Sequence, residues 1–388
     1  MGGGIQAPRD SLGQVLLALH EAGGTASRAE LTDRLGVGRS VMGYLLGELD
    51  DLGLITIDRN GARTAGEGGR PSHLVTVSPS APTVVAAHID ADTFSVGTVG
   101  LGGRVLSRSE HPLRSPHATE TLDDLASVVS SYVRDGVLGV GLAVSSPVRT
   151  SDGFAPAALH MGWPGVPLRE LMRERLGSVP LQVANNANLA ALAEYRHGAG
   201  RGATQLLYLT TAHVGLGGAT ISEGRLFTGA HGYAMEPGHI TVDPAGALCR
   251  CGSTGCLEVE ADHLALLRLL GLTDVSLRDV AARVDALLAA PSVSVLEAVR
   301  QVNTRLAIGL ASLANIVDAD RIVLGGTLGR LYTLEPGVVR STLAERAFLT
   351  DLAHTPIVPG ELADSVLLGA AELALQPLLD DPRGVLKN

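Results

Sequence analysis

The spacing of apolar residues along the first fifty positions predicts a series of short amphipathic helices. Residues 11–22 place apolar side chains three or four positions apart, the period of an α-helix; these are Leu12, Val15, Leu16 and Leu19. A second helix is expected after Ser27, because Glu30 completes a capping box and Gly36 ends the helix about two turns later. A third helix follows Gly38, and its inner face carries Met42, Leu45, Leu46 and Leu49.

The glycine-rich residues that come next predict a β-ribbon. Residues 54–78 contain two strand-like segments separated by the stretch GARTAGEGGRP. Three short helices and a ribbon are typical of a winged helix-turn-helix, so residues 8–80 are predicted to form a DNA-binding domain, with residues 81–83 as a linker. A helical protein-interaction domain is the alternative, because seven arginines in residues 1–80 are outnumbered by nine acidic residues.

In a winged helix-turn-helix the third helix lies in the major groove, with its first exposed side chains nearest the base edges. Those residues are Arg39, Ser40, Gly43 and Tyr44. The Arg39 guanidinium is suited to guanine O6 and N7 or to a phosphate. Arg70, at the tip of the ribbon, is expected to reach a minor groove. This module therefore predicts binding to double-stranded DNA.

From residue 84 onward, apolar strands alternate with longer helices. Two strands, a glycine turn, a third strand, a helix and a buried strand follow one another up to about residue 148, and a similar order recurs from residue 205. This duplication predicts an α/β fold with two lobes and a cleft between them. We expect the first lobe to span about 84–187 together with the C-terminal helix 364–380, and the second lobe to span about 188–362.

Composition narrows the class of protein. Of 388 residues, 45% are apolar and 18% charged, and no apolar run approaches the ~18 residues that a membrane span needs. With an N-terminus that lacks the layout of a signal peptide, this predicts a soluble cytoplasmic protein with no membrane partner. The net charge of −10 argues against a surface that is basic throughout, but not against one DNA-binding module. Lys387 is the only lysine, which excludes a Walker-type phosphate loop.

All three cysteines of the chain lie within eight residues of one another, shortly after a histidine. Cys249, Cys251 and Cys256 with His239 offer three thiolates and an imidazole, a complete tetrahedral set for Zn²⁺. Because no coordination position stays open, the predicted zinc is structural and not catalytic. Reduced thiols in a turn are the alternative, since an odd number of cysteines fits no disulfide framework.

The segment EPGHITVDPAGALCRCGSTGCLEVEAD around these cysteines resembles the signature of the ROK family of bacterial repressors and sugar kinases. The segments VANNANLAALAE, GVGLAVSSPV, HMGWPGVPL and RIVLGGTL resemble other blocks of that family, so that the resemblance covers residues 84–388. It implies a duplicated, ribonuclease H-like fold of the actin-like ATPase type and the same four zinc ligands. A winged helix in front of this domain is the layout of the repressor branch.

The resemblance also implies a sugar site. In the family, the acids before and after the cysteine segment, here Glu236 and Glu258, hydrogen-bond sugar hydroxyls, and the histidine at position 239 both ligates zinc and faces the sugar. Carboxylates suit this role because they accept hydrogen bonds from two adjacent hydroxyls. Asn185 and Asn186 are expected to be further hydrogen-bonding partners of the sugar. His160 stands where relatives often carry asparagine, which leaves its role open.

Kinase activity is not expected. Family kinases carry Asn-Asp-Ala-Asn where this chain has Asn185-Asn186-Ala187-Asn188, and the Asn186 amide keeps hydrogen bonding but cannot accept a proton as general base. Asp92 and Thr93 replace the glycines of the first phosphate loop, and His213 and Val214 replace the usual Gly-Thr of the second. Gly325 and Gly326, near the expected adenine site, are retained.

Together these features predict a transcriptional regulator, most simply a repressor, whose non-catalytic domain binds a sugar or sugar derivative. Two winged helices in a homodimer, or in a dimer of dimers, would then read a palindromic operator. The apolar segments HLALLRLLGL and ASLANIVDA are candidate dimer faces or, equally, core. The rival interpretations are a residual ATP-dependent sugar kinase, a sensor of zinc itself, and a regulator whose pocket no longer responds to sugar.

Overall fold

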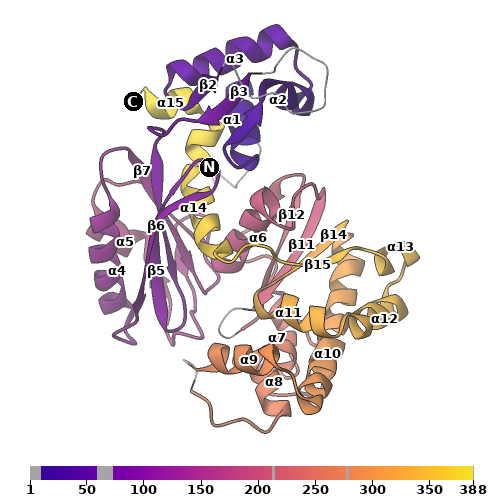
Figure 1. The fold of residues 1–388 in the computed structure, drawn as a ribbon. Helices are drawn as coiled ribbons and strands as arrows, with labels where there is room; N and C mark the ends of the chain where they lie inside the picture. Colours follow the sequence, from indigo (N-terminus) through magenta and orange to yellow (C-terminus); the bar gives the residue numbers. More distant parts are fainter. Residues whose placement is uncertain (1–9, 59–72, 212–214, 277–278, 388) are drawn as a thin grey trace.

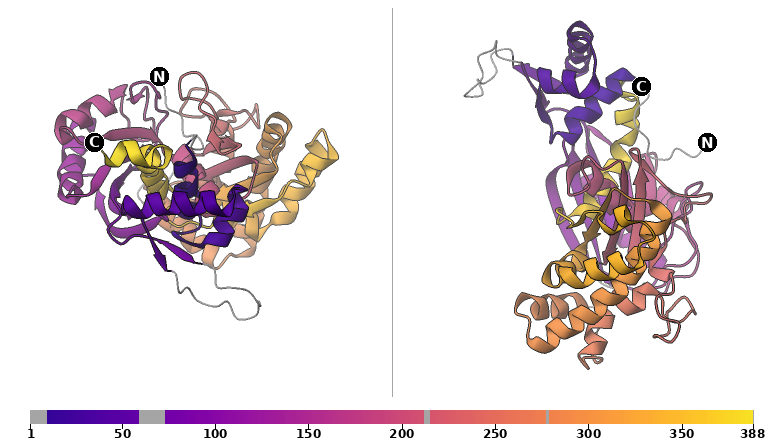
Figure 2. Two further views of the ribbon diagram at one scale, coloured as in Figure 1. Left: turned by 90° about the horizontal axis from the view of Figure 1, so that it is seen from above. Right: turned by 90° about the vertical axis from the view of Figure 1, so that its right-hand side faces the viewer.

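The computed structural model describes residues 10–58, 73–211, 215–276 and 279–387 (Figure 1). Within these ranges the strands form two five-stranded sheets, a three-stranded sheet near the N-terminus and a two-stranded ribbon. Figure 2 shows the N-terminal module at one end of an elongated molecule, with the C-terminal helix beside it.

The N-terminal module contains the three expected helices, α1 (Ser11–Glu21), α2 (Arg28–Leu35) and α3 (Arg39–Asp51). The capping box at the start of α2 is present, since Ser27 Oγ accepts from the Glu30 amide at 3.2 Å and Glu30 Oε2 accepts from the Ser27 amide at 2.7 Å. The inner faces of these helices are buried together in one core.

The module's sheet differs from the predicted two-stranded ribbon. Strands β2 (Ile55–Asp58) and β3 (Leu74–Val77) are joined by a third strand, β1 (Thr25–Ser27), in the order β1-β3-β2. β1 was not predicted because it is only three residues long and its partner comes about fifty residues later, with Ala26 opposite Val75. The expected linker at residues 81–83 is also shorter, because Thr83 is already the first residue of β4.

The first large sheet has the order β10-β7-β4-β5-β6. Its strands are β4 (Thr83–Ile89), β5 (Thr93–Gly100), β6 (Arg104–Pro112), β7 (Val137–Val144) and β10 (Leu181–Asn185). Strands β4, β5 and β6 are antiparallel, whereas β7 and β10 run parallel to β4. The helices α4 (Ala118–Tyr132) and α5 (Leu168–Leu176) cover one face, as Figure 1 shows.

The second large sheet has the order β13-β12-β11-β14-β15. Its strands are β11 (Gln205–Thr211), β12 (Gly217–Ser222), β13 (Arg225–Leu226), β14 (Arg321–Gly325) and β15 (Ile357–Pro359). Alternation along β11 separates two cores: Leu207 and Leu209 pack against the outer helices, while Leu206 and Tyr208 face the middle of the molecule.

The outer helices of this half are α7 (Leu257–Ala261), α8 (His263–Leu269), α9 (Val280–Ala289), α10 (Val293–Val317), α11 (Gly326–Leu334), α12 (Pro336–Arg346) and α13 (Thr350–Ala353). The two segments considered as dimer faces, within α8 and α10, mostly contribute to this core, although the Ile316 side chain is exposed. None of the helices in the described ranges is both long and apolar enough to cross a bilayer.

Two helices lie between the sheets: α6 (Asn186–His197) and α14 (Ser365–Asp380). α14 packs on β4 and β7, and α6 packs on both α14 and β12. The two helices touch closely because position 369 is glycine: a Cβ there would lie 1.9 Å from the Leu189 carbonyl oxygen of α6. After α14, the short helix α15 (Pro382–Leu386) returns to the N-terminal module. The remaining elements are the ribbon strands β8 (Phe154–Ala155) and β9 (Val166–Pro167), and a 3₁₀ turn at Pro237–His239.

Candidate functional site

A cavity of about 190 Å³ lies where the two halves of the molecule meet. The parallel strands β4, β7 and β10 end at one edge of their sheet, and the residues at these ends line the cavity from one side. Loops of the second half close the other side. All five residues that the sequence suggested for a sugar line this cavity, namely Asn185, Asn186, Glu236, His239 and Glu258.

Asn185 is fixed in the cavity wall by both ends of its amide. Its Oδ1 accepts from the Asn188 amide at 3.0 Å and so caps the N-terminus of α6. Its Nδ2 donates to the Ser146 carbonyl at 3.0 Å. The side chain therefore ties the first turn of α6 to the loop after β7, which makes it a rigid part of the site.

Asn186 is held in a similar way at the first position of α6. Its Nδ2 donates to Ser145 Oγ at 2.9 Å, and its Oδ1 accepts from the Ala187 amide at 2.9 Å. Ser145 Oγ in turn donates to Asp90 Oδ1 at 3.2 Å. The carboxylate of this part of the cavity is thus Asp90, one hydroxyl away from Asn186. The sequence analysis considered this loop only through Asp92 and Thr93; the position of Asp90 directly after β4 was the available signal.

Glu258, at the start of α7, is buried and directed at the cavity. Its Oε2 accepts from the Leu216 amide at 3.2 Å and lies 3.7 Å from His160 Nε2. Burial alone raises the pKa of this carboxyl, but the interactions with His160 and Leu216 outweigh it and hold the pKa below its ordinary value. Glu258 is therefore an ionised acceptor in a buried position.

The pKa of Glu236 is shifted in the opposite direction. Burial, followed by the negative charge of Glu258, raises the pKa of Glu236 to about 7. One carboxyl of the pair is therefore charged, while the other is protonated in about half of the molecules at pH 7, so the cavity can offer both an acceptor and a donor to a polyhydroxyl ligand.

His160 belongs to the cavity wall, although sequence reasoning left its role open. It faces Glu258, and its Nδ1 lies 3.5 Å from Arg250 Nη1. The same ring also lines a neighbouring cavity of about 450 Å³ that contains Asp92 and Trp163. The HMGWPGVPL segment was the signal that pointed to this histidine.

The four expected metal ligands come together beside the cavity. The ligand atoms of His239, Cys249, Cys251 and Cys256 all lie within 4.8 Å of one another. Cys249 Sγ is 3.8 Å from His239 Nδ1, and Cys251 Sγ is 3.7 Å from Cys256 Sγ. Around a tetrahedral Zn²⁺ with bonds of about 2.3 Å, neighbouring sulfurs would be about 3.8 Å apart. All three cysteines are free thiols, so this donor set fits zinc.

A family model described as the ROK family matches residues 84–377. The chain belongs to the ROK family. Membership confirms the resemblance read from the sequence, and the duplicated α/β fold is confirmed as well.

Two groups of ROK relatives differ in how much of this chain they cover. A "Putative xylose repressor" of Caldicellulosiruptor sp. (strain Rt8B.4) is 26% identical over 92% of this chain and 94% of its own length. A "Glucokinase" of Halalkalibacterium halodurans is 30% identical over 63% of this chain and 80% of its own length.

Solved structures divide in the same way. A ROK family transcriptional regulator, described as a homologue of the E. coli MLC protein, matches with a TM-score of 0.76 at 21% identity and covers 97% of this chain and 98% of its own. A ROK family glucokinase from Streptomyces griseus, in complex with glucose and AMPPNP, has a TM-score of 0.66 at 29% identity and covers 76% of this chain and 99% of its own. The regulator therefore also has a counterpart of the N-terminal module.

Four of the five residues expected to contact DNA lie in the first turns of α3 in this ROK protein. Arg39, Ser40 and Tyr44 are exposed, and Tyr44 retains 65% of its accessible surface. Gly43 differs from the expectation because it is partly buried: the Arg28 guanidinium passes over it and donates to the Arg39 carbonyl at 2.5 Å. The sequence analysis did not predict that Arg28 contacts the predicted recognition helix, because Arg28 belongs to α2 and only residues of α3 were considered. Arg70 lies outside the described residues.

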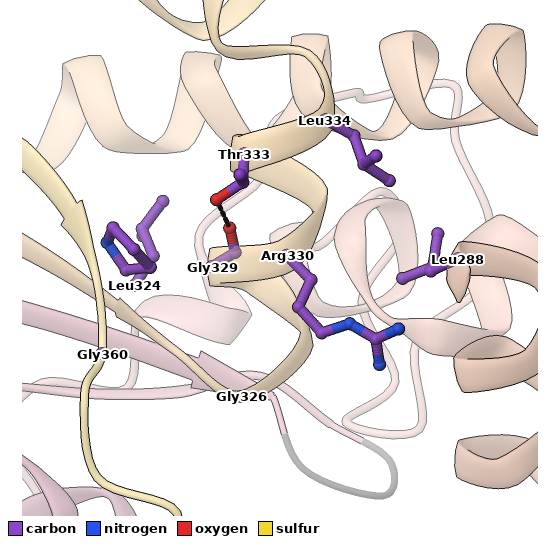
Figure 3. A pocket seen from close by; sticks show the side chains of 9 residues that line it. Leu288, Leu324, Gly326, Gly329, Arg330, Thr333, Leu334 and Gly360 are labelled. Carbon is purple, nitrogen blue, oxygen red and sulfur yellow. Dashed lines mark hydrogen bonds between the residues drawn. The ribbon is translucent and has the colours of Figure 1, made fainter. Parts of the chain in front are cut away.

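A third cavity, of about 280 Å³, opens beside Gly326 at the start of α11 (Figure 3). It is the region where the ROK resemblance places adenine in kinases. Arg330 is paired with Asp285, and Thr333 Oγ1 donates to the Gly329 carbonyl at 2.8 Å, so these lining groups already have partners. Leu288, Leu324, Leu334 and Pro359 make the rest of the lining mainly apolar. His213 and Val214, the altered positions of the second phosphate loop, lie outside the described residues.

Proposed function

We propose that this ROK protein is a sugar-responsive, DNA-binding transcriptional repressor. The observation that carries the proposal is the pairing of an intact sugar-sized cavity with an N-terminal module shared with ROK regulators. Relatives named as xylose repressors span more than nine-tenths of the chain, module included, whereas the glucokinase from Halalkalibacterium halodurans covers 63% of it.

Residues 8–80 act as a winged helix-turn-helix in this proposal, and residues 84–388 as the effector domain. Arg39, Ser40 and Tyr44 contact DNA from α3, with Gly43 allowing Arg28 to cross the helix close to its backbone. Arg70 remains a proposed minor-groove contact. A homodimer would present two such helices to a palindromic operator.

The effector would be a sugar or sugar derivative bound by Asn185, Asn186, Glu236, His239 and Glu258. Ionised Glu258 accepts hydrogen bonds from two neighbouring hydroxyls, and the Glu236 carboxyl, whose raised pKa allows it to carry a proton near pH 7, can donate as well as accept. Glu258 is buried and the other four side chains are partly buried. Hydrogen bonds already orient Asn185, Asn186 and Glu258, so binding requires little reorganisation of the wall.

Zinc would be held by His239, Cys249, Cys251 and Cys256 and would supply a fixed tetrahedral cross-link. Because His239 also lines the cavity, the cross-link would keep the segment carrying Glu236 and the segment carrying Glu258 on one wall. Its role is structural, and no step of effector binding passes through the metal.

The effector assignment is tested by a thermal-shift screen of the full chain with D-xylose, D-glucose and their amino and phosphate derivatives. A bound sugar raises the Tm by mass action. Glu258→Gln should remove the shift, because an isosteric amide replaces the charged acceptor. Glu120→Gln, on the exposed surface of α4, is the matched control and should retain the shift. If no sugar of the panel raises the Tm of the wild type, the proposal of a sugar-responsive function is wrong.

A residual sugar kinase is the second candidate, favoured by the glucokinase relatives and by Asp90 in the cavity. The Asn186 amide argues against it, since it cannot take a hydroxyl proton. An ATP- and Mg²⁺-dependent phosphorylation assay separates the two candidates. We expect no turnover from the wild type, and robust hexose phosphorylation would establish the kinase instead.

A further inference from the structure

A buried polar cluster joins the N-terminal module to the two helices between the sheets. At its centre is Glu372 of α14, which is fully buried. Glu372 Oε1 lies 2.7 Å from His20 Nε2 of α1 and 2.8 Å from His197 Nε2 of α6. Glu372 Oε2 accepts from Arg196 Nη1 of α6 at 2.5 Å. Three separate elements therefore meet at one carboxylate.

The partners of His20 define where its proton lies. The Gly102 amide is 2.8 Å from His20 Nδ1, and a backbone N–H can only donate, so Nδ1 is the acceptor. The proton is therefore on Nε2 and is donated to Glu372. His20, His197 and Glu372 are close enough to hold a metal, but a protonated Nε2 cannot be a ligand. The cluster is thus a hydrogen-bonded joint and not a metal site.

The joint is charged and closely packed. Although burial raises the pKa of Glu372, His20, Arg196 and His197 outweigh this effect and hold it well below its ordinary range. The Gly102 turn between β5 and β6 lies directly on the Gly23-Gly24 turn that ends α1, because a Cβ at Gly102 would come within 2.8 Å of that backbone. The module therefore rests on the first large sheet without intervening side chains.

A second contact fixes the same module from the C-terminal side. Arg383 of α15 donates to both carboxylate oxygens of Glu48 in α3, at 2.9 and 2.5 Å. α15 follows α14 directly, as Figure 1 shows. The α14–α15 segment thus touches both α1 and α3, the helix proposed to enter the major groove.

Helix α6 connects this joint to the effector cavity. It begins at Asn185 and Asn186 in the cavity wall and ends at Arg196 and His197 in the joint. Its 12 residues span about 17 Å. Close packing against α14 at Gly369 leaves little room for the two helices to move independently.

We propose that α6 and the Glu372 joint couple the effector cavity to the DNA-binding module. A shift of the first turn of α6 is carried along the helix to Arg196 and His197, and through Glu372 to His20, which changes the placement of α1. This inference rests on the proposed function for its biological use. The mechanical coupling itself needs neither sugar nor operator to be measured.

Hydrogen exchange on the full-length, zinc-loaded chain tests the coupling without a ligand. His20→Leu removes the hydrogen bonds of His20 to Glu372 and to the Gly102 amide, but leaves Glu372 with Arg196 and His197. We expect backbone amides of the first turn of α6 to exchange about tenfold faster in this variant. Glu21→Gln is the matched control, since Glu21 is the next residue and pairs with Arg34 inside the module. Changes confined to α1 and the Gly102 turn would overturn the proposal.

A variant at the cavity end of α6 tests the coupling independently by hydrogen exchange if His20→Leu fails to fold. Asn185→Ala removes the cap of α6 at the cavity, and the proposal expects faster exchange in α1 and at the Gly102 amide. Protection in α1 equal to that of the wild type would contradict it.

The same variants separate this proposal from the function on which it rests. With D-xylose or D-glucose and an operator selected from random duplexes, the sugar should change operator affinity at least about fivefold in the wild type. In His20→Leu the sugar should still raise the Tm, while the fold-change in operator affinity that the sugar causes falls to about one. Absence of any sugar shift in the wild type defeats the effector assignment, and the exchange data then decide the coupling alone. A sugar effect on affinity that His20→Leu leaves unchanged defeats the coupling.

Discussion

His239 Nδ1 lies 3.8 Å from Cys249 Sγ, and the same histidine lines the cavity that contains Glu236 and Glu258. The proposed metal site and the proposed effector site therefore share a side chain. Loss of the metal is expected to affect both the stability of the loop and the shape of the cavity.

We predict that the purified protein carries one zinc per chain and that Cys251→Ser loses it. A tetrahedral cross-link contributes to folding directly, so the variant should unfold roughly 5–10 °C below the wild type and bind sugar more weakly. Metal content by elemental analysis and Tm by calorimetry measure this. Thr254→Ala, an exposed position in the same loop, is the control and should keep its zinc. A metal-free wild type with unchanged Tm would contradict a structural zinc.

Glu236 predicts a specific pH dependence of stability. Its pKa is about 7 in the folded protein, against an ordinary value of 4.5, because of burial and then the charge of Glu258. The folded state therefore holds a proton that the unfolded chain releases, and the free energy of unfolding falls as pH rises from about 4.5 to 7. Glu236→Gln has no such ionisation. The Tm of the variant minus the Tm of the wild type should therefore increase as the pH is raised from 5 to 8. Thermal melts across this range, with Glu120→Gln as control, measure the difference; an offset that does not vary with pH would refute it.

Glu372→Gln should strongly destabilise the protein. It leaves the buried Arg196 guanidinium without its carboxylate, a loss that typically costs about 3–5 kcal/mol. Glu110→Gln breaks only an exposed pair with Arg108 and should change the free energy of unfolding by less than about 0.5 kcal/mol. Denaturant titrations give the free energy of unfolding of each variant. If Glu372→Gln lowers it no more than Glu110→Gln does, the Glu372 joint does not stabilise the fold.

Arg39→Ala should weaken operator binding. If the guanidinium reads a guanine, the loss is about 1–3 kcal/mol and specificity at that base relaxes; if it contacts phosphate, the loss is uniform and the salt slope falls by about one. Fluorescence anisotropy at several salt concentrations distinguishes these outcomes. Arg175→Ala is the control: this arginine lies on α5, far along the chain from α3, and pairs with Asp123 of α4, so the variant should bind the operator normally. Equal affinity of Arg39→Ala and the wild type would remove α3 as the recognition helix.

The sequence alone determined the features that depend on local pattern. The helical period and the capping box at Ser27 predicted α1, α2 and α3, and strand alternation with glycine turns predicted the duplicated sheets. The spacing of Cys249, Cys251 and Cys256 after His239 predicted the ligand cluster, because these residues lie close along the chain.

Only the tertiary structure decided which distant residues meet. The contact of Asp90 with Ser145 and Asn186, and the pairing of β1 with β3, join segments far apart in sequence, where no local period carries information. The same holds for the Glu372 joint: His20 and Glu372 are 352 positions apart, and their proximity follows from how α14 packs between the sheets and reaches the N-terminal module. Local sequence propensity determines which helices and strands form. How those elements pack against one another depends on which charged groups are buried together and on the core that they share.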